Sequence, residues 1–127
     1  MRNFLHTRAR SLLNAIRGWW FVVRTQQNAW IHAVVTVFVI TLALWLDLPL
    51  RDWAVLFLAI AMVWAAEFFN TSIEAVVDLA SPAHHPLAKV GKDVGAAAVL
   101  IAALTSIIIG ILILGPPLWE RIKSLLD

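Results

Sequence analysis

Two long stretches without a formally charged side chain most constrain the fold of this chain. Residues 25–46 contain no Asp, Glu, Lys or Arg, and residues 94–119 contain none either. About 20 consecutive apolar residues in a helix cross the hydrocarbon core of a bilayer. Because lipid offers no hydrogen-bond partner to the backbone, only helices and closed barrels span it. Runs of this length predict membrane-spanning helices.

A third apolar run starts at Trp53, reaches Glu67 and keeps helical spacing as far as the break at Ser81 and Pro82. The composition agrees, since 61% of the 127 residues are hydrophobic and only 14% are charged. A soluble domain of this size could not bury so much apolar surface. We therefore expect one all-α membrane domain over residues 1–127, with transmembrane helices at 29–46, 53–80 and 92–115.

Residues 1–27 have a different pattern, in which an apolar stripe is flanked by arginines spaced seven residues apart. This pattern predicts an amphipathic helix that lies in the membrane interface, with tryptophan at the depth of the headgroups. An Arg-rich transit peptide remains an alternative on this pattern alone. The stripe comprises Leu5, Leu12, Ile16, Trp19, Trp20 and Val23, and the arginines are Arg10, Arg17 and Arg24.

The distribution of basic residues predicts the orientation. Five arginines precede the first span, Arg51 is the only basic residue of the first loop, and Lys89 and Lys92 follow the second span. Under the positive-inside rule, the N-terminus and the second loop face the cytoplasm. Arg121 and Lys123, which follow the third span, weakly favour the opposite orientation.

Four polar residues of the second span, Glu67, Asn70, Glu74 and Asp78, are spaced so that they share one helical face. At 100° per residue they fall within an arc of about 80°, and they extend over roughly 16 Å along the axis. Glu67 follows fourteen uncharged residues and so lies at membrane depth. A carboxylate there is costly unless a cation, a metal ion or water accompanies it.

Lys89, Lys92 and Asp93 open the third span, and they bring basic groups to the end that faces these acids. Carboxylates suit Mg²⁺ and ammonium groups suit phosphate oxygens, so the mixed patch fits a metal-chelated polyphosphate. The sequence has no Walker-type glycine loop. Structural ion pairs between these acids and lysines remain an equally simple interpretation. We expect His32, beside Trp30, to be an interfacial anchor.

The run AEFFNTSIEAVVD at residues 66–78 resembles the signature of the prokaryotic diacylglycerol kinase family, which includes undecaprenol kinases. The similarity continues through HHPLAK at 84–89 and KDVGAAA at 92–98. The resemblance implies a homotrimer in the bacterial inner (cytoplasmic) membrane, with active sites between subunits on the cytoplasmic side. It implies an ATP-dependent lipid kinase that transfers the γ-phosphate to the hydroxyl of diacylglycerol or undecaprenol, with Mg²⁺ as cofactor. The HHPLAK loop slightly favours undecaprenol.

The same resemblance implies a role for each site residue. Glu67 would be the general base and Glu74 a Mg²⁺ ligand, while Gln26 stands where family members commonly have a second metal-ligating Glu. The ATP-binding and phosphate-binding residues would be Lys92, Asp93, Asp78, Asn70 and Lys89, and we expect Trp30 and Phe69 to contact lipid.

Two other functions remain open on the sequence. One is a small non-catalytic membrane subunit, in which the intramembrane charges are structural or conduct ions. The other is a catalytically silent family member, because Gln26 replaces a carboxylate. We expect no nucleic-acid partner, since the N-terminal arginines suit lipid headgroups.

Overall fold

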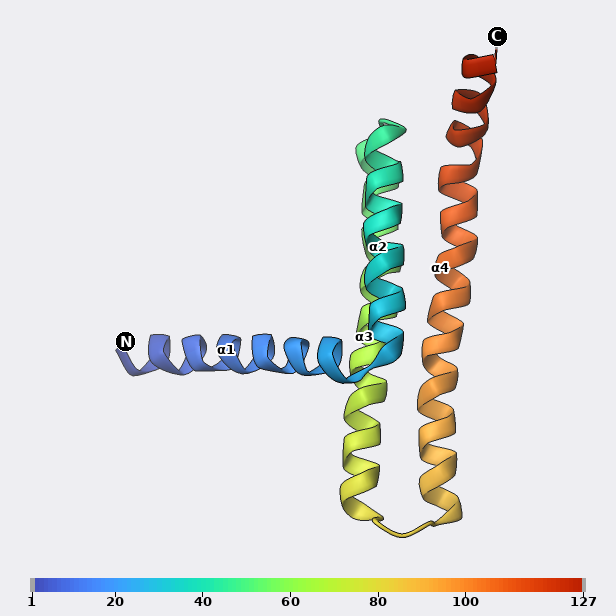
Figure 1. Ribbon diagram of the computed structural model, residues 1–127. Coiled ribbons are helices and arrows are strands. Elements are labelled where there is room, and N and C mark those ends of the chain that lie inside the picture. Colours follow the sequence, from blue (N-terminus) through green and yellow to red (C-terminus); the bar gives the residue numbers. More distant parts are fainter. Residues whose placement is uncertain (1, 127) are drawn as a thin grey trace.

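The computed structural model describes residues 2–126, and the side chains of residues 6–126. The described chain is entirely helical, which confirms the predicted all-α class (Figure 1). Leu5 of the predicted apolar stripe lies outside the described side chains. The four helices are α1 (Arg2–Thr25), α2 (Gln27–Trp45), α3 (Leu50–Ala80) and α4 (Pro86–Leu126).

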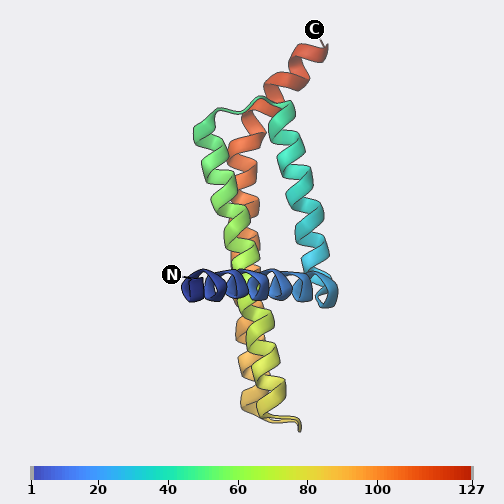
Figure 2. The same ribbon diagram turned by 90° about the vertical axis from the view of Figure 1, so that its left-hand side faces the viewer.

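Helix α1 runs across the other three helices instead of along them (Figures 1 and 2). Only Gln26 separates α1 from α2, and its extended backbone (φ −100°, ψ 119°) turns the chain. The buried Val22 and the ring of Trp19, stacked on Trp64 of α3 at 5.7 Å, join α1 to the bundle. Arg24 lies over the ring of Trp20, with 4.7 Å between its guanidinium carbon and the ring centroid. This arrangement is that of a helix lying flat at a membrane surface.

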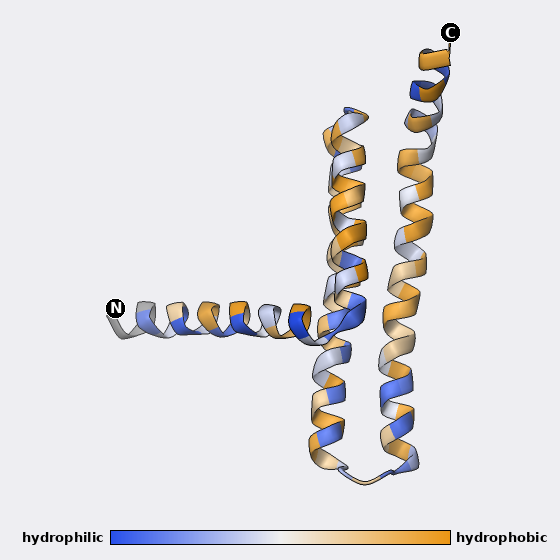
Figure 3. Ribbon diagram, in the orientation of Figure 1, coloured by the Kyte–Doolittle hydropathy of each residue, from blue (hydrophilic) through white to orange (hydrophobic). Residues whose placement is uncertain are grey.

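Helices α2, α3 and α4 are each long and apolar enough to cross a membrane. Helix α2, with 19 residues, is about 28 Å long and matches a hydrocarbon core of about 30 Å. Helices α3 and α4, with 31 and 41 residues, measure about 46 and 62 Å. They therefore continue past the level of α1. We call this part the projecting hairpin: it comprises the C-terminal part of α3, the loop at 81–85 and the N-terminal part of α4. Hydrophilic positions gather in it (Figure 3).

Helix α4 extends beyond the predicted span at both ends. It begins at Pro86, where the missing N–H is not needed because the first turn of a helix has no acceptor for it. It also continues through Pro116 and Pro117 to Leu126, although the sequence predicted an end at Gly115. Proline is tolerated inside membrane helices because neighbouring helices, side chains, water and local changes of the helix satisfy the freed backbone groups. Figure 2 shows α4 bending near its C-terminal end, as helices do at proline.

Polar side chains join the membrane helices at mid-depth. The indole N–H of Trp64 donates to Oγ1 of Thr36 at 3.2 Å, which ties α3 to α2. The hydroxyl of Ser106 donates to the carbonyl of Ala59 at 3.1 Å, which ties α4 to α3. A small apolar core packs beside the α2–α3 turn, at the end of the bundle away from the projecting hairpin. Its buried members are Ala43, Leu48, Leu56 and Leu114.

Candidate functional site

Glu67 is the largest fully buried side chain of the described part of the chain, with a relative exposure of 0%. Neither of its carboxyl oxygens has a hydrogen-bond partner. A buried polar group without a partner costs on the order of 1–3 kcal/mol. Native proteins keep few such groups, and they concentrate where a substrate or another ligand completes the bonding.

Asn70 and Glu74 occupy the next two turns of α3. Nδ2 of Asn70 donates to Oε1 of Glu74 at 3.1 Å. Oδ1 of Asn70 is buried without a partner, and it faces the backbone of α4 at Gly95. A Cβ atom at Gly95 would overlap with this oxygen. The glycine therefore lets α4 approach α3 closely at the level of Asn70.

The charged residues beyond Asn70 form two ion pairs. Nζ of Lys92 lies 2.5 Å from Oδ1 of Asp78 and bridges α4 to α3. Nζ of Lys89 lies 2.9 Å from Oδ2 of Asp93, within α4, and both side chains are largely exposed. The hydrogen bond to Asp93 and the charge of that carboxylate raise the pKa of the Lys89 ammonium, which stays protonated at neutral pH. The structure thus brings Asp78 and Lys92 together and leaves Lys89 and Asp93 paired with each other.

Exposure rises along the polar face of α3. Glu67 is buried, Glu74 is half-buried and Asp78 is exposed. The face therefore has a buried end at Glu67, level with α1, and an exposed end at Asp78, in the projecting hairpin. We call these the dry end and the wet end. A group confined to the bilayer can approach the first end, and a soluble polyanion can approach the second.

The structure does not connect every predicted site residue. Gln26 is half-buried at the corner between α1 and α2, and its side chain forms no cap on α2. Among the side chains of residues 6–126, no hydrogen bond or ion pair joins it to Glu74. Trp30 and Phe69, the predicted lipid contacts, are 61% and 72% exposed and face outward.

The oxygen donors of α3 fit a magnesium ion that arrives with phosphate ligands. Within the described residues, no group of three His, Cys, Asp or Glu side chains could hold a metal alone. Mg²⁺ is commonly held by one or two carboxylates, with phosphate oxygens and water completing its shell. Glu74 uses only Oε1 in its bond to Asn70, so Oε2 remains for such an ion.

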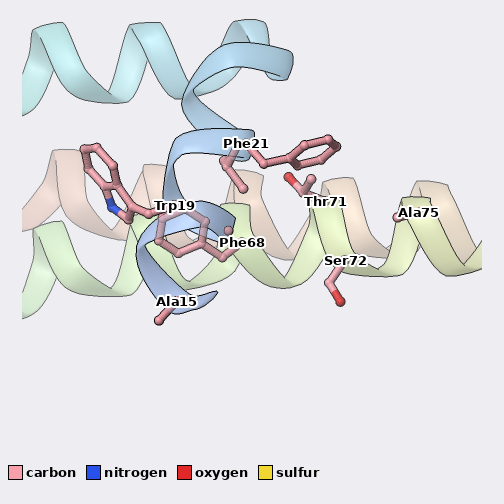
Figure 4. A pocket seen from close by; sticks show the side chains of 9 residues that line it. Ala15, Trp19, Phe21, Phe68, Thr71, Ser72 and Ala75 are labelled. Carbon is pink, nitrogen blue, oxygen red and sulfur yellow. The ribbon is translucent and has the colours of Figure 1, made fainter. Parts of the chain in front are cut away.

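A pocket of about 540 Å³ lies between α1 and α3, beside the polar face (Figure 4). Thr71 lies where this pocket meets that face, and its hydroxyl donates to the carbonyl oxygen of Glu67 at 2.9 Å. The pocket is apolar and sits at the level of the surface helix, so it suits the part of a lipid near its headgroup. Its lining side chains include Ala15, Trp19 and Phe21 from α1 and Phe68, Thr71, Ser72 and Ala75 from α3.

The sequence did not identify His32 as part of the site. The structure places its Nε2 atom 3.8 Å from Oε2 of Glu67, on the facing side of α2. One sequence signal could have found it, because His32 is the only titratable side chain between residues 25 and 46. A titratable group within a membrane span commonly faces a functional interior.

Comparison with known proteins gives consistent matches. Residues 13–114 match the profile of the family described as prokaryotic diacylglycerol kinase. The chain is 40% identical over 117 residues to an undecaprenol kinase of Bacillus subtilis (strain 168), covering 92% of this chain and 95% of that protein. It is 42% identical over 115 residues to a diacylglycerol kinase of Synechocystis sp., covering 87% and 66% of the two chains. A diacylglycerol kinase of Escherichia coli (strain K12) is 34% identical over 87 residues, covering 63% and 71%.

Proposed function

This chain belongs to the prokaryotic diacylglycerol kinase family and is a membrane lipid kinase, and we propose that phosphoryl transfer takes place along the polar face of α3. The family match spans every candidate site residue from Gln26 to Asp93. Family membership also disfavours a non-catalytic subunit with structural or ion-conducting charges. The observation that carries the proposal is the buried, unpartnered carboxyl group of Glu67 at the dry end of this face.

In this proposal Glu67 acts on the acceptor. One of its carboxylate oxygens takes the proton of the lipid hydroxyl as the hydroxyl oxygen attacks the γ-phosphorus of ATP. The bond between that phosphorus and the β–γ bridging oxygen breaks, and ADP leaves with the electron pair. Positioning and electrostatics supply most of the catalysis in phosphoryl transfer, so a base held at membrane depth suits an acceptor confined to the bilayer.

The wet end of the face would receive ATP. Lys92, held by Asp78, would contact phosphate oxygens, and Lys89 and Asp93 would contact the exposed part of the nucleotide. Glu74, with Gln26, would hold Mg²⁺, and Asn70 would support the site by donating to Oε1 of Glu74. When bound, Mg²⁺ would neutralise charge on the β- and γ-phosphates.

We propose undecaprenol as the preferred acceptor over diacylglycerol. The B. subtilis relative, which this chain matches over 95% of its length, is named an undecaprenol kinase. The headgroup end of either lipid would enter the pocket between α1 and α3, with Trp30 and Phe69 contacting the surrounding lipid.

We also propose a homotrimer in the bacterial inner membrane, with the N-terminus and the projecting hairpin in the cytoplasm. The hairpin carries Lys89 and Lys92, and α1 carries the N-terminal arginines, so both basic segments lie on one side of the membrane spans. This is also the side that cytoplasmic ATP reaches.

The proposal is tested by incubating the purified protein in detergent micelles with Mg²⁺ and ATP labelled in the γ-phosphate. Diacylglycerol and undecaprenol are supplied in parallel at equal mole fraction. We expect labelled lipid with both, and a higher kcat/KM with undecaprenol. Faster transfer to diacylglycerol would contradict the acceptor assignment. Absence of product from both lipids, in protein shown to be folded, would favour a catalytically silent member.

A further inference from the structure

His32 and Glu67 face each other across two helices as an unsatisfied polar pair. Nε2 of His32 lies 3.8 Å from Oε2 of Glu67. Glu67 is buried and His32 is half-buried, but the Nε2 atom of His32 is buried, and neither it nor the two carboxyl oxygens has a hydrogen-bond partner. The separation exceeds hydrogen-bond length by less than 1 Å. Catalytic hydrogen bonds are often this loose before substrate binds.

Among the side chains of residues 6–126, Nε2 of His32 is the one buried nitrogen atom without a hydrogen-bond partner. Thr71, one turn away on α3, already donates its hydroxyl to the backbone carbonyl of Glu67. The side-chain amide of Asn70 donates to Oε1 of Glu74 and not to Glu67. Among the side chains that the structure describes, His32 is therefore the one that can orient the carboxyl group of Glu67.

Aromatic residues hold His32 in place. The ring of Trp64 packs edge-on against the imidazole, with 6.3 Å between ring centroids, and its N–H binds Thr36 one turn along α2. Trp64 is itself stacked on Trp19 of α1. Helices α1, α2 and α3 thus meet at the ring of Trp64, one turn along α3 from the proposed base.

We propose that His32 is a positioning residue for phosphoryl transfer, an inference that rests on the proposed role of Glu67 as base. The N–H at Nε2 donates to Oε2 of Glu67 when the acceptor binds. This bond fixes the carboxylate so that its other oxygen, Oε1, faces the lipid hydroxyl. His32 touches neither ATP nor the acceptor, so its loss should affect turnover more than substrate binding.

Three substitutions separate positioning from packing. His32→Phe keeps a ring against Trp64 but removes the donor, and His32→Ala removes both. His32→Gln keeps an N–H donor at nearly the same distance from the backbone. We expect kcat to fall at least about tenfold in His32→Phe and His32→Ala, with the KM for ATP within about twofold of wild type, because loss of alignment acts on the chemical step. His32→Gln should recover most of the lost kcat.

A second test leaves His32 unchanged and measures the NMR signals of its imidazole in folded protein. In protein with ¹⁵N-labelled histidine, the imidazole nitrogen signals of His32 should shift between wild type and Glu67→Gln when undecaprenol is present. The signals of His84 and His85, in the α3–α4 loop, serve as internal controls and should not shift.

The outcomes separate this inference from the proposed function. Wild-type activity in His32→Phe, or no recovery in His32→Gln, would overturn the positioning role while leaving the kinase proposal intact. Unchanged His32 signals in Glu67→Gln would do the same. Wild-type protein that phosphorylates neither lipid would overturn the kinase proposal and the role of His32 with it.

Discussion

At the scale of single residues, exposure increases along the polar face of α3. Glu67 is sealed from solvent, Glu74 is half-buried and Asp78 is exposed, although all three lie on one helical face. The same residue type can therefore serve as a base at one position and as a ligand for a soluble metal–nucleotide complex at another. Predictions about single residues follow from where each lies on this gradient.

A substitution at Gln26 tests whether this residue is a ligand of the proposed magnesium ion. Gln26→Glu adds a carboxylate where the chain has a neutral amide, and a charged partner is worth about 1 kcal/mol more than a neutral one. We expect the Mg²⁺ concentration for half-maximal activity to fall about fivefold. The control is Gln27→Glu, which adds the same charge to the neighbouring, exposed side chain. An equal shift in both variants, or a shift in neither, would count against Gln26 as a ligand.

A substitution at Lys92 tests whether this residue contacts the phosphates of ATP. Loss of a charge-assisted contact to phosphate costs on the order of 1.5–3 kcal/mol, so Lys92→Met should raise the KM for ATP at least about tenfold. The matched control is Lys123→Met, near the opposite end of α4. Steady-state kinetics with ATP as the varied substrate measure both. A KM for ATP that is unchanged in Lys92→Met would remove Lys92 from the proposed site.

At this scale the sequence predicted which polar residues share a face of α3, but it did not predict that His32 lies beside Glu67. The spacing of Glu67, Asn70, Glu74 and Asp78 predicted their shared face because helix geometry alone determines it. The contact between His32 and Glu67 joins residues 35 positions apart. It depends on how α2 packs against α3, which no local pattern records.

At the scale of helices, the close approach of α3 and α4 holds Asn70 in place. Gly95→Ala would place a methyl group against Oδ1 of Asn70. Overpacking of this kind costs roughly 1–3 kcal/mol. We expect a lower midpoint of thermal unfolding and a fall in kcat of about tenfold or more, because displaced groups lose alignment.

Gly110 provides the control for this prediction. It lies on the same helix, and an added Cβ there would meet no atom within 4 Å. Gly110→Ala should leave kcat within about twofold of wild type, and the gain in helix propensity is about 1 kcal/mol. Similar losses in both alanine variants would show that Gly95 has no special role beside Asn70.

The presence of the membrane helices was predictable, but the ends of α4 were not. Long uncharged runs had to be helical because lipid leaves the backbone no other partner. Pro116 and Pro117 would normally end a helix in water, so they predicted an end at Gly115. The helix nevertheless continues through both prolines to Leu126, since membrane proteins can satisfy the freed backbone groups in other ways.

At the scale of the whole molecule, subunit mixing tests whether the proposed trimer builds each site from one chain or, as the family resemblance implies, from two neighbouring chains. At an ATP concentration well below the KM of Lys92→Met, Glu67→Gln and Lys92→Met should each have little activity when alone. If Glu67 and Lys92 of one site come from different chains, mixed trimers contain some sites with both native residues. Random mixing should then restore up to about a quarter of the wild-type activity.

Subunit mixing distinguishes this arrangement from a site within one chain. The two variants are unfolded together, refolded into micelles and assayed for phosphorylated lipid. Each variant refolded alone is the control. Full inactivity of the mixture, with trimers present, would place Glu67 and Lys92 of each site on the same chain.

The central claim is that Glu67 is the base for transfer of phosphate from ATP to a membrane lipid. The most direct measurement compares wild type with Glu67→Gln, matched in size, for formation of labelled undecaprenyl phosphate in micelles with Mg²⁺ and labelled ATP. The account predicts product from wild type and a rate at least about 100-fold lower from the variant, the usual contribution of a general base. Equal rates from the two folded proteins would contradict it.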